Sequence, residues 1–166
     1  MLSCPALDEP GLNRLATLLA PLVRGGGVIY LSGDLGAGKT TFARALLGAL
    51  GVPTRVKSPT YSLIESYNSG PLSIHHLDLY RIADASELEW LGLADLLAAP
   101  FLVLVEWPVR GAAALPAPDL TIRLAHAGDA RSLDFEASSD RGRAWLGQLL
   151  QNTTSPTGPP RLRTHS

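Results

Sequence analysis

The stretch that constrains this chain most is Gly33-Asp34-Leu35-Gly36-Ala37-Gly38-Lys39-Thr40, which is followed by Thr41. It satisfies the pattern G-x-x-x-x-G-K-[ST], in which glycines let backbone N–H groups surround an anion. In such a loop the lysine bridges the outer phosphates of a nucleotide, and the hydroxyl that follows ligates Mg²⁺. The sequence therefore predicts that residues 33–41 bind the phosphates of ATP, with Lys39 on the phosphates and Thr40 on the metal.

The sequence around this loop favours the prediction over a chance match within a turn. Residues 28–31 are an apolar run typical of a buried parallel strand, and residues 39–50 have helical periodicity. The helix would point its N-terminal dipole at the same anion. Lys39 is also one of only two lysines among 14 basic residues, and it stands where a compact ammonium is needed.

The remaining periodicity predicts an α/β fold of the P-loop NTPase type. Its central sheet is mostly parallel and flanked by helices, and its late strands are antiparallel. We expect further helices at 9–23, at 85–97 with an interruption near Gly92, and at 140–150. We expect further strands at 61–67, 72–77, 101–105, 120–124 and 132–136. Residues 1–151 are predicted to form one domain, and residues 152–166 a disordered tail.

Composition limits the classes of function. The chain has 166 residues, a net charge of −1 and a single cysteine, Cys4. Because it has no excess of positive charge, we do not expect it to hold nucleic acid by itself. No apolar run reaches the roughly 18 residues that span a bilayer, so no membrane association is expected. The single cysteine fits a protein of the reducing cytoplasm.

Two carboxylates are candidates for the metal-binding and catalytic side of the site. A P-loop site needs an acidic residue at the end of a neighbouring strand, which holds Mg²⁺ directly or through water. Glu106 follows the apolar run 101–105, and Asp78 follows the more mixed run 74–77. From the residues alone, either could be the closer metal ligand, and either could be a solvated carboxylate at a strand end.

A third candidate is Thr60, in the segment 57–62 that follows the predicted helix. Segments in this position often switch conformation with the nucleotide, and Thr60 could meet the γ-phosphate or a water on the metal. An ordinary turn before a strand explains the segment equally well.

Four motifs together resemble the TsaE (YjeE) family, over about residues 8–150. These are Gly33 to Phe42, Ser58-Pro59-Thr60-Tyr61, His76-Leu77-Asp78-Leu79-Tyr80-Arg81 and Val105-Glu106-Trp107-Pro108. Members of this family are bacterial ATPases that act with the TsaB–TsaD pair to make threonylcarbamoyladenosine at position 37 of tRNA. The resemblance implies a P-loop α/β fold, Mg·ATP as ligand and slow intrinsic hydrolysis of ATP.

The resemblance also implies roles for individual residues. Lys39 matches the phosphate lysine, and Thr40 and Glu106 match the Mg²⁺ ligands. Asp78 and Thr60 match the catalytic and switch positions, with Glu106 also part of the catalytic set. We expect tRNA to be reached only through the TsaB–TsaD complex, and the chain alone to be a monomer or a weak oligomer. Val109 and Leu12 depart from the family pattern, at a secondary contact and at the contact with the nucleotide base.

Two other classes compete with this interpretation. A small-molecule kinase would need an acceptor pocket and usually an arginine-rich lid, and the arginines here are scattered. A GTP switch would need the base-reading motif N-K-x-D, which is absent from the sequence. The P-loop kinase is therefore the alternative that we keep.

Overall fold

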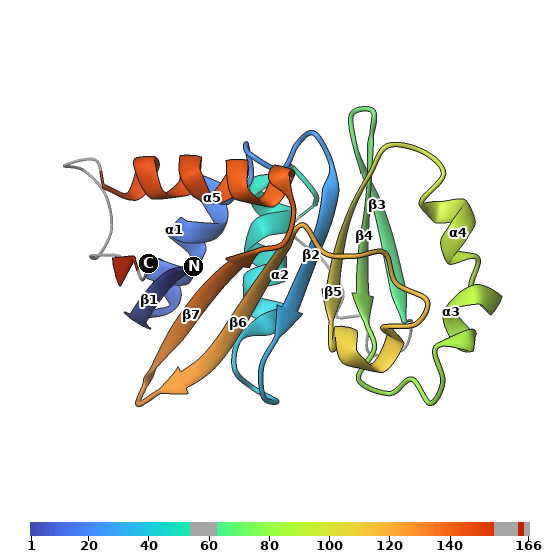
Figure 1. The fold of residues 1–166 in the computed structure, drawn as a ribbon, viewed down its shortest axis with the longest axis horizontal. Coiled ribbons are helices and arrows are strands. Elements are labelled where there is room, and N and C mark those ends of the chain that lie inside the picture. Colours follow the sequence, from blue (N-terminus) through green and yellow to red (C-terminus); the bar gives the residue numbers. More distant parts are fainter. Residues whose placement is uncertain (54–62, 155–162, 165–166) are drawn as a thin grey trace.

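The computed structural model describes residues 1–53, 63–154 and 163–164. One mixed sheet runs through the molecule, and helices lie against it (Figure 1). In chain order the elements are β1 (Leu2–Leu7), α1 (Glu9–Leu19), β2 (Gly27–Ser32), α2 (Lys39–Ala49), β3 (Ile64–Ser69), β4 (Leu72–Asp78), α3 (Ser86–Trp90), α4 (Leu93–Leu96), β5 (Phe101–Glu106), the 3-10 helix η1 (Pro108–Gly111), β6 (Leu120–Ala127), β7 (Ala130–Ala137), α5 (Asp140–Thr153) and β8 (Arg163–Thr164).

The strand order is β3-β4-β5-β2-β6-β7-β1-β8. The four central strands β4, β5, β2 and β6 are parallel, and the strands outside them pair antiparallel. This confirms the predicted α/β class, with a parallel centre and an antiparallel late pair. Since the parallel strands share a direction, β4, β5 and β2 end at the same edge of the sheet (Figure 1).

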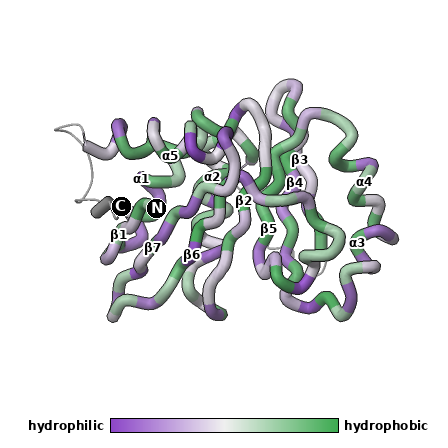
Figure 2. The backbone as a smooth tube through the Cα atoms, in the orientation of Figure 1, coloured by the Kyte–Doolittle hydropathy of each residue, from purple (hydrophilic) through white to green (hydrophobic). Residues whose placement is uncertain are grey.

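Alternate side chains of the central strands enter two separate hydrophobic clusters, because successive residues of a strand point to opposite faces. Ile29 and Leu104 pack with α1, α2 and α5 on one face. Val28 and Val103, each one residue earlier on the same strands, pack with α3 and α4 on the other face. Both faces of β5 are therefore buried, and Figure 2 shows the hydrophobic colouring along this strand.

Several predicted boundaries differ from those observed. The first helix ends at Leu19, four residues earlier than predicted, because a turn follows it. The predicted interruption at Gly92 is confirmed: this glycine has a φ of 75° and separates α3 from α4. Strand β1 was not predicted. It contains Pro5 and polar residues, and it pairs with β7 across a bulge between Cys4 and Leu7.

The C-terminal part of the chain also differs from the prediction at one point. Helix α5 continues to Thr153, whose hydroxyl donates hydrogen bonds to the carbonyls of Leu149 and Leu150. Residues 152 and 153 therefore belong to the folded domain rather than to a tail. Arg163–Thr164 pairs with β1. The rest of the predicted tail lies outside the described residues, so its disorder stays a prediction.

Candidate functional site

The glycine-rich segment forms the loop that joins β2 to α2. Gly36 and Gly38 have φ values of 79° and 105°, a region that favours glycine. Gly38 directly precedes α2, and no side chain within the described residues caps this helix. The first N–H groups of α2 therefore stay available to a ligand, and the positive end of the helix dipole faces the loop.

Gly33 is required by its close contact with the neighbouring strand β6. Its φ is 145°, and a Cβ at this position would overlap the backbone carbonyl of Leu124. We expect Gly33→Ala to lower the free energy of unfolding by about 1–3 kcal/mol, through backbone strain and overlap. Gly48→Ala is the matched control, because Gly48 lies in α2 with open space around it. It should raise stability by about 0.5–1 kcal/mol.

Urea unfolding of the two variants measures both effects. Equal stability of Gly33→Ala and the unmodified chain would contradict the close contact between Gly33 and Leu124.

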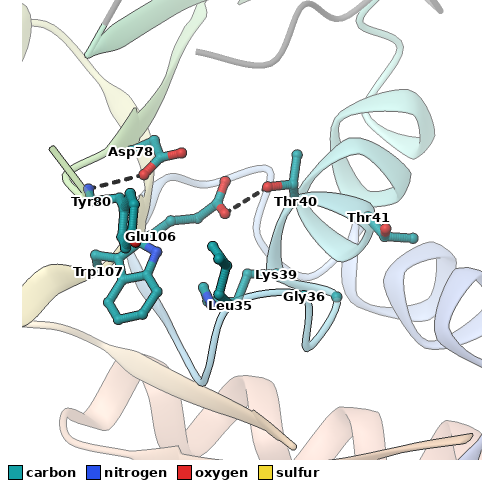
Figure 3. Close-up of a pocket in the computed structure, with 10 residues that line it drawn as sticks. Leu35, Gly36, Lys39, Thr40, Thr41, Asp78, Tyr80, Glu106 and Trp107 are labelled. Atoms are coloured by element: carbon teal, nitrogen blue, oxygen red, sulfur yellow. Dashed lines mark hydrogen bonds between the residues drawn. The ribbon is translucent and has the colours of Figure 1, made fainter. Parts of the chain in front are cut away.

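A pocket of about 200 Å³ opens between this loop and the ends of β4 and β5 (Figure 3). Its walls come from segments that are distant in the sequence. The residues that line the pocket are Leu35, Gly36, Gly38, Lys39, Thr40, Thr41, Asp78, Tyr80, Glu106 and Trp107.

The structure thus brings together most of the predicted site residues. Gly33, Asp34 and Ala37 do not line the pocket. The first two supply carbonyl groups to Lys39, and Ala37 is buried below the loop, where its N–H donates to the Asp34 carbonyl. Thr60 lies outside the described residues.

Lys39 is folded back onto its own loop. Its Nζ donates hydrogen bonds to the carbonyls of Gly33, at 2.5 Å, and Asp34, at 2.8 Å. It also lies 4.3 Å from the centre of the Trp107 ring, a cation–π contact. Burial lowers the pKa of the ammonium, and the nearby carboxylates of Glu106 and Asp78 oppose that shift. A polyanion entering the pocket would stabilise the charged form of this desolvated ammonium.

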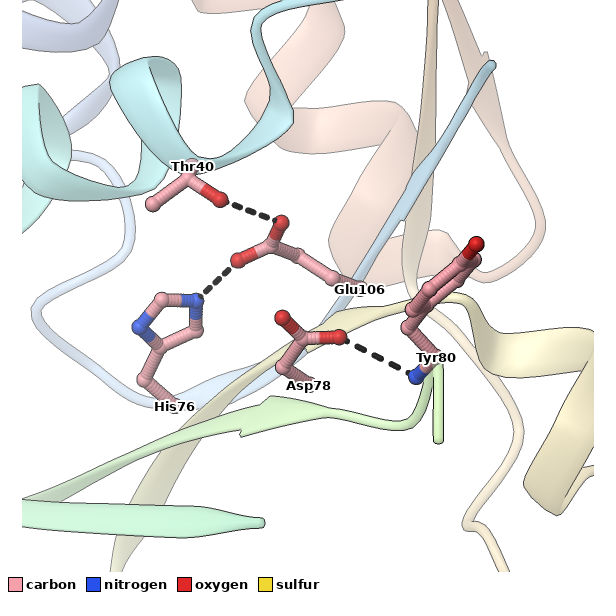
Figure 4. A network of polar contacts seen from close by, with 5 residues as sticks. All are labelled: Thr40, His76, Asp78, Tyr80 and Glu106. Atoms are coloured by element: carbon pink, nitrogen blue, oxygen red, sulfur yellow. Dashed lines mark hydrogen bonds and ion pairs between the residues drawn. The ribbon is translucent and has the colours of Figure 1, made fainter. Parts of the chain in front are cut away.

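Glu106 is the carboxylate that reaches the loop. It ends β5 with 2% of its surface exposed. Its Oε1 accepts a hydrogen bond from the Thr40 hydroxyl at 2.7 Å, and its Oε2 lies 2.6 Å from Nε2 of His76 (Figure 4). The sequence left open which carboxylate is the closer Mg²⁺ ligand. In the structure it is Glu106 that contacts the Thr40 hydroxyl.

Asp78 occupies the equivalent position on the neighbouring strand. It pairs with Glu106 in the parallel register of β4 and β5, and its Oδ1 accepts a hydrogen bond from the backbone N–H of Tyr80 at 3.1 Å. Burial raises the pKa of the Asp78 carboxyl, and the negative charge of Glu106 adds to the shift. Asp78 is therefore a stronger base than an ordinary aspartate, placed at the wall of the pocket.

Trp107 and Tyr80 form the aromatic side of the pocket. Trp107 has a φ of 58°. Within the described residues, it is the only non-glycine residue with a positive φ. Its ring centre lies 5.0 Å from that of Tyr80. The Arg110 guanidinium stacks over both rings, 5.4 Å from Tyr80 and 6.0 Å from Trp107. The strained turn after Glu106 thus places an aromatic ring over Lys39.

The donor atoms in the pocket suit a magnesium ion. A hydroxyl from Thr40 and carboxylates from Glu106 and Asp78 are hard oxygen ligands. Within the described residues, no three His, Cys, Asp or Glu side chains gather as a complete metal cage. Mg²⁺ rarely needs one, because it keeps several waters and shares phosphate oxygens of its substrate.

Two contacts were not predicted, that of His76 with Glu106 and that of Arg131 with Gly36. The sequence placed His76 in a motif but gave it no role, although its spacing of two from Asp78 puts both on one face of β4. Arg131 of β7 donates to the Gly36 carbonyl at 3.5 Å. No local pattern indicates this contact, since it depends on how the β6–β7 hairpin lies beside the loop.

The fold and the pocket define an α/β protein of the P-loop NTPase type. The family model for threonylcarbamoyl adenosine biosynthesis protein TsaE matches residues 7–133. The chain therefore belongs to the TsaE family. Within the parts of the chain that the structure describes, no helix is both long enough and apolar enough to cross a membrane.

Individual relatives agree with this assignment. The tRNA threonylcarbamoyladenosine biosynthesis protein TsaE of Haemophilus influenzae is 42% identical over 116 residues, which are 70% of this chain and 73% of that protein. Its counterpart in Bacillus subtilis is 41% identical over 130 residues, 78% of this chain and 81% of that protein. The crystal structure of YdiB from Bacillus subtilis superposes with a TM-score of 0.75 at 30% identity, covering 91% of this chain and 97% of that one.

Proposed function

We propose that this chain binds and hydrolyses Mg·ATP in support of threonylcarbamoyladenosine formation at position 37 of tRNA, together with TsaB and TsaD. The observation that carries the nucleotide part is the partly buried hydrogen bond from Thr40 to Glu106, in a pocket that also holds the Lys39 ammonium. The tRNA part is supported by membership of the TsaE family and by the names of the relatives, which are threonylcarbamoyladenosine biosynthesis proteins.

In this proposal the loop and Lys39 bind the phosphates. Lys39 exchanges its two carbonyl partners, Gly33 and Asp34, for phosphate oxygens, which are stronger acceptors because they are charged. The Thr40 hydroxyl can donate to Glu106 and still offer a lone pair to Mg²⁺. When bound, Mg²⁺ would neutralise charge on the phosphates.

Asp78 is the residue that we assign to hydrolysis. Its carboxylate lies at the wall of the pocket, where it could accept a hydrogen bond or a proton from the attacking water. Tyr80 holds one of its oxygens, Oδ1, through a backbone N–H (Figure 4). Asp78 also lines the pocket. Thr60 remains our proposed contact to the γ-phosphate or to a water on the metal.

The partners are proposed because we expect the chain by itself to be a poor catalyst. An essential group supplied in trans, such as an arginine finger, can be worth about 10³–10⁵ in rate. The net charge of −1 gives no reason to expect direct binding of tRNA. We therefore expect tRNA to be reached only through TsaB–TsaD, and weak ATP hydrolysis to be stimulated by that complex.

The test is tRNA modification by purified TsaB and TsaD over many turnovers, with and without this chain. Product formation should depend on the chain, and Thr60→Ala should reduce stimulation of ATP hydrolysis more than it reduces ATP binding. If product is formed equally well without the chain and with its Lys39→Ala variant, the tRNA assignment is wrong. ATP consumption that instead requires a small acceptor would favour a kinase.

Trp107 should report the state of the nucleotide site. Lys39 lies over its ring, and nucleotide would draw that ammonium towards the phosphates. We expect tryptophan emission to differ between the free, ADP and non-hydrolysable ATP forms. Trp107→Phe should abolish the difference, whereas Trp90→Phe should preserve it, because the Trp90 side chain is 89% exposed on α3. Identical emission in all three forms would contradict the contact.

A further inference from the structure

His76 is a fully buried histidine, with no exposed surface, on the strand that ends at Asp78. One ring nitrogen, Nε2, lies 2.6 Å from Oε2 of Glu106. The other, Nδ1, has no hydrogen-bond partner within the described ranges. A buried polar atom without a partner costs free energy. Within the described ranges, the polar contact of the His76 ring is the one with Glu106.

The two oxygens of Glu106 are divided between two donors. Thr40 donates to Oε1, and Nε2–H of His76 donates to Oε2 (Figure 4). In this tautomer Nδ1 carries only a lone pair, which is less costly to leave unpaired than an N–H group. Because each oxygen has its own donor, the carboxylate cannot rotate without losing one of the two bonds.

The register of β4 and β5 places His76 and Glu106 relative to each other. In the parallel pairing of β4 and β5, His76 lies opposite Leu104 and Asp78 lies opposite Glu106. His76 and Asp78 therefore extend from the same face of β4, two residues apart. The imidazole reaches towards the end of β5 beneath the pocket, and it does not line the pocket itself.

We infer that His76 is a positioning residue, which holds Oε2 of Glu106 so that Oε1 stays directed at Thr40 and the metal. This assignment rests on the proposed Mg·ATP function. Hydrogen bonds of this kind orient metal-binding side chains, and their loss typically costs about 10–100-fold in metal affinity. Removing the imidazole leaves a buried carboxylate oxygen without this donor, so Glu106 would turn away from its present orientation.

Calorimetric titration with a non-hydrolysable ATP analogue, with and without Mg²⁺, tests the inference. The measured quantity is the gain in affinity that Mg²⁺ produces. We expect His76→Leu to reduce this gain by about 10–100-fold, while affinity without metal stays near that of the unmodified chain. His76→Gln should retain most of the gain, because its amide N–H can reach the position of Nε2.

His75 supplies a matched control. This neighbouring histidine is also buried, but its ring nitrogens contact the Ser66 hydroxyl, at 2.8 Å, and the Leu96 carbonyl, at 3.1 Å, away from the pocket. His75→Leu should lower stability and leave the effect of Mg²⁺ intact. If His76→Leu does not fold, His76→Asn against His76→Gln makes the same test, because the shorter amide does not reach Glu106.

The outcomes separate the two proposals. A full Mg²⁺ effect in His76→Leu, or an equal loss in the His75 control, would overturn the role of His76 and leave the proposed function standing. Absence of any Mg²⁺ effect in the unmodified chain would overturn the proposed function, and the role of His76 with it.

Discussion

Replacing Lys39 by alanine is expected to weaken ATP binding by about 10²–10⁴-fold. The ammonium makes two hydrogen bonds within the loop and is the group that would meet the phosphates. Hydrogen bonds to charged groups contribute about 1.5–3 kcal/mol each, so the loss of two such bonds from the ammonium to phosphate oxygens amounts to about 3–6 kcal/mol. Each 1.4 kcal/mol corresponds to a tenfold change in affinity.

Arg44→Ala is the matched control for this experiment. Arg44 is an exposed cation on the same helix α2, so its removal changes the net charge equally. Calorimetric titration should show near-normal affinity for Arg44→Ala and a large loss for Lys39→Ala. Alanine is compatible with the first turn of a helix, and circular dichroism can verify that the variant is folded. Unchanged ATP affinity in folded Lys39→Ala would refute the phosphate-loop assignment.

Glu106→Gln and Asp78→Asn are expected to fail in different ways. Glu106 faces two donors, the Thr40 hydroxyl and His76. A glutamine there would turn its own N–H towards one of them, and an unpaired buried donor costs about 1–3 kcal/mol. We expect this variant to lose both Mg²⁺-dependent nucleotide binding and stability.

Asp78→Asn should bind ATP and hydrolyse it about 10²–10⁴-fold more slowly, the range typical of a lost general base. Its amide oxygen can still accept from the Tyr80 N–H. The raised pKa of Asp78 means that the folded chain holds this proton more tightly than the unfolded chain does. The stabilising contribution is therefore present at acid pH and lost as the pH rises through the raised pKa. At pH 7, Asp78→Asn should be at least as stable as the unmodified chain.

Nucleotide titration, single-turnover hydrolysis and urea unfolding distinguish the two variants. If Asp78→Asn loses Mg²⁺-dependent binding while Glu106→Gln retains it and only hydrolyses slowly, the two roles must be exchanged.

The features that depend on neighbouring residues could be predicted from the sequence alone. The loop pattern at 33–40 and the apolar run at 101–105 are local signals, since a turn, a strand or a helix imposes a period on adjacent side chains. Those signals placed β2, α2 and β5 within one or two residues. They also put Glu106 and Asp78 at strand ends, where parallel neighbours meet at one edge.

Which groups are in contact depends on the tertiary structure. β1 pairs with β7, more than 120 residues away. Neither the composition of residues 2–7 nor the spacing of their apolar side chains predicts a strand. The bond between His76 and Glu106 joins residues 30 positions apart, and the contact of Glu106 with Thr40 joins residues 66 positions apart. Such contacts depend on strand register and on packing across the sheet, which are set by many distant residues together. Local patterns therefore identified the two carboxylates, whereas the packing of the sheet against the loop determines that Glu106 contacts Thr40.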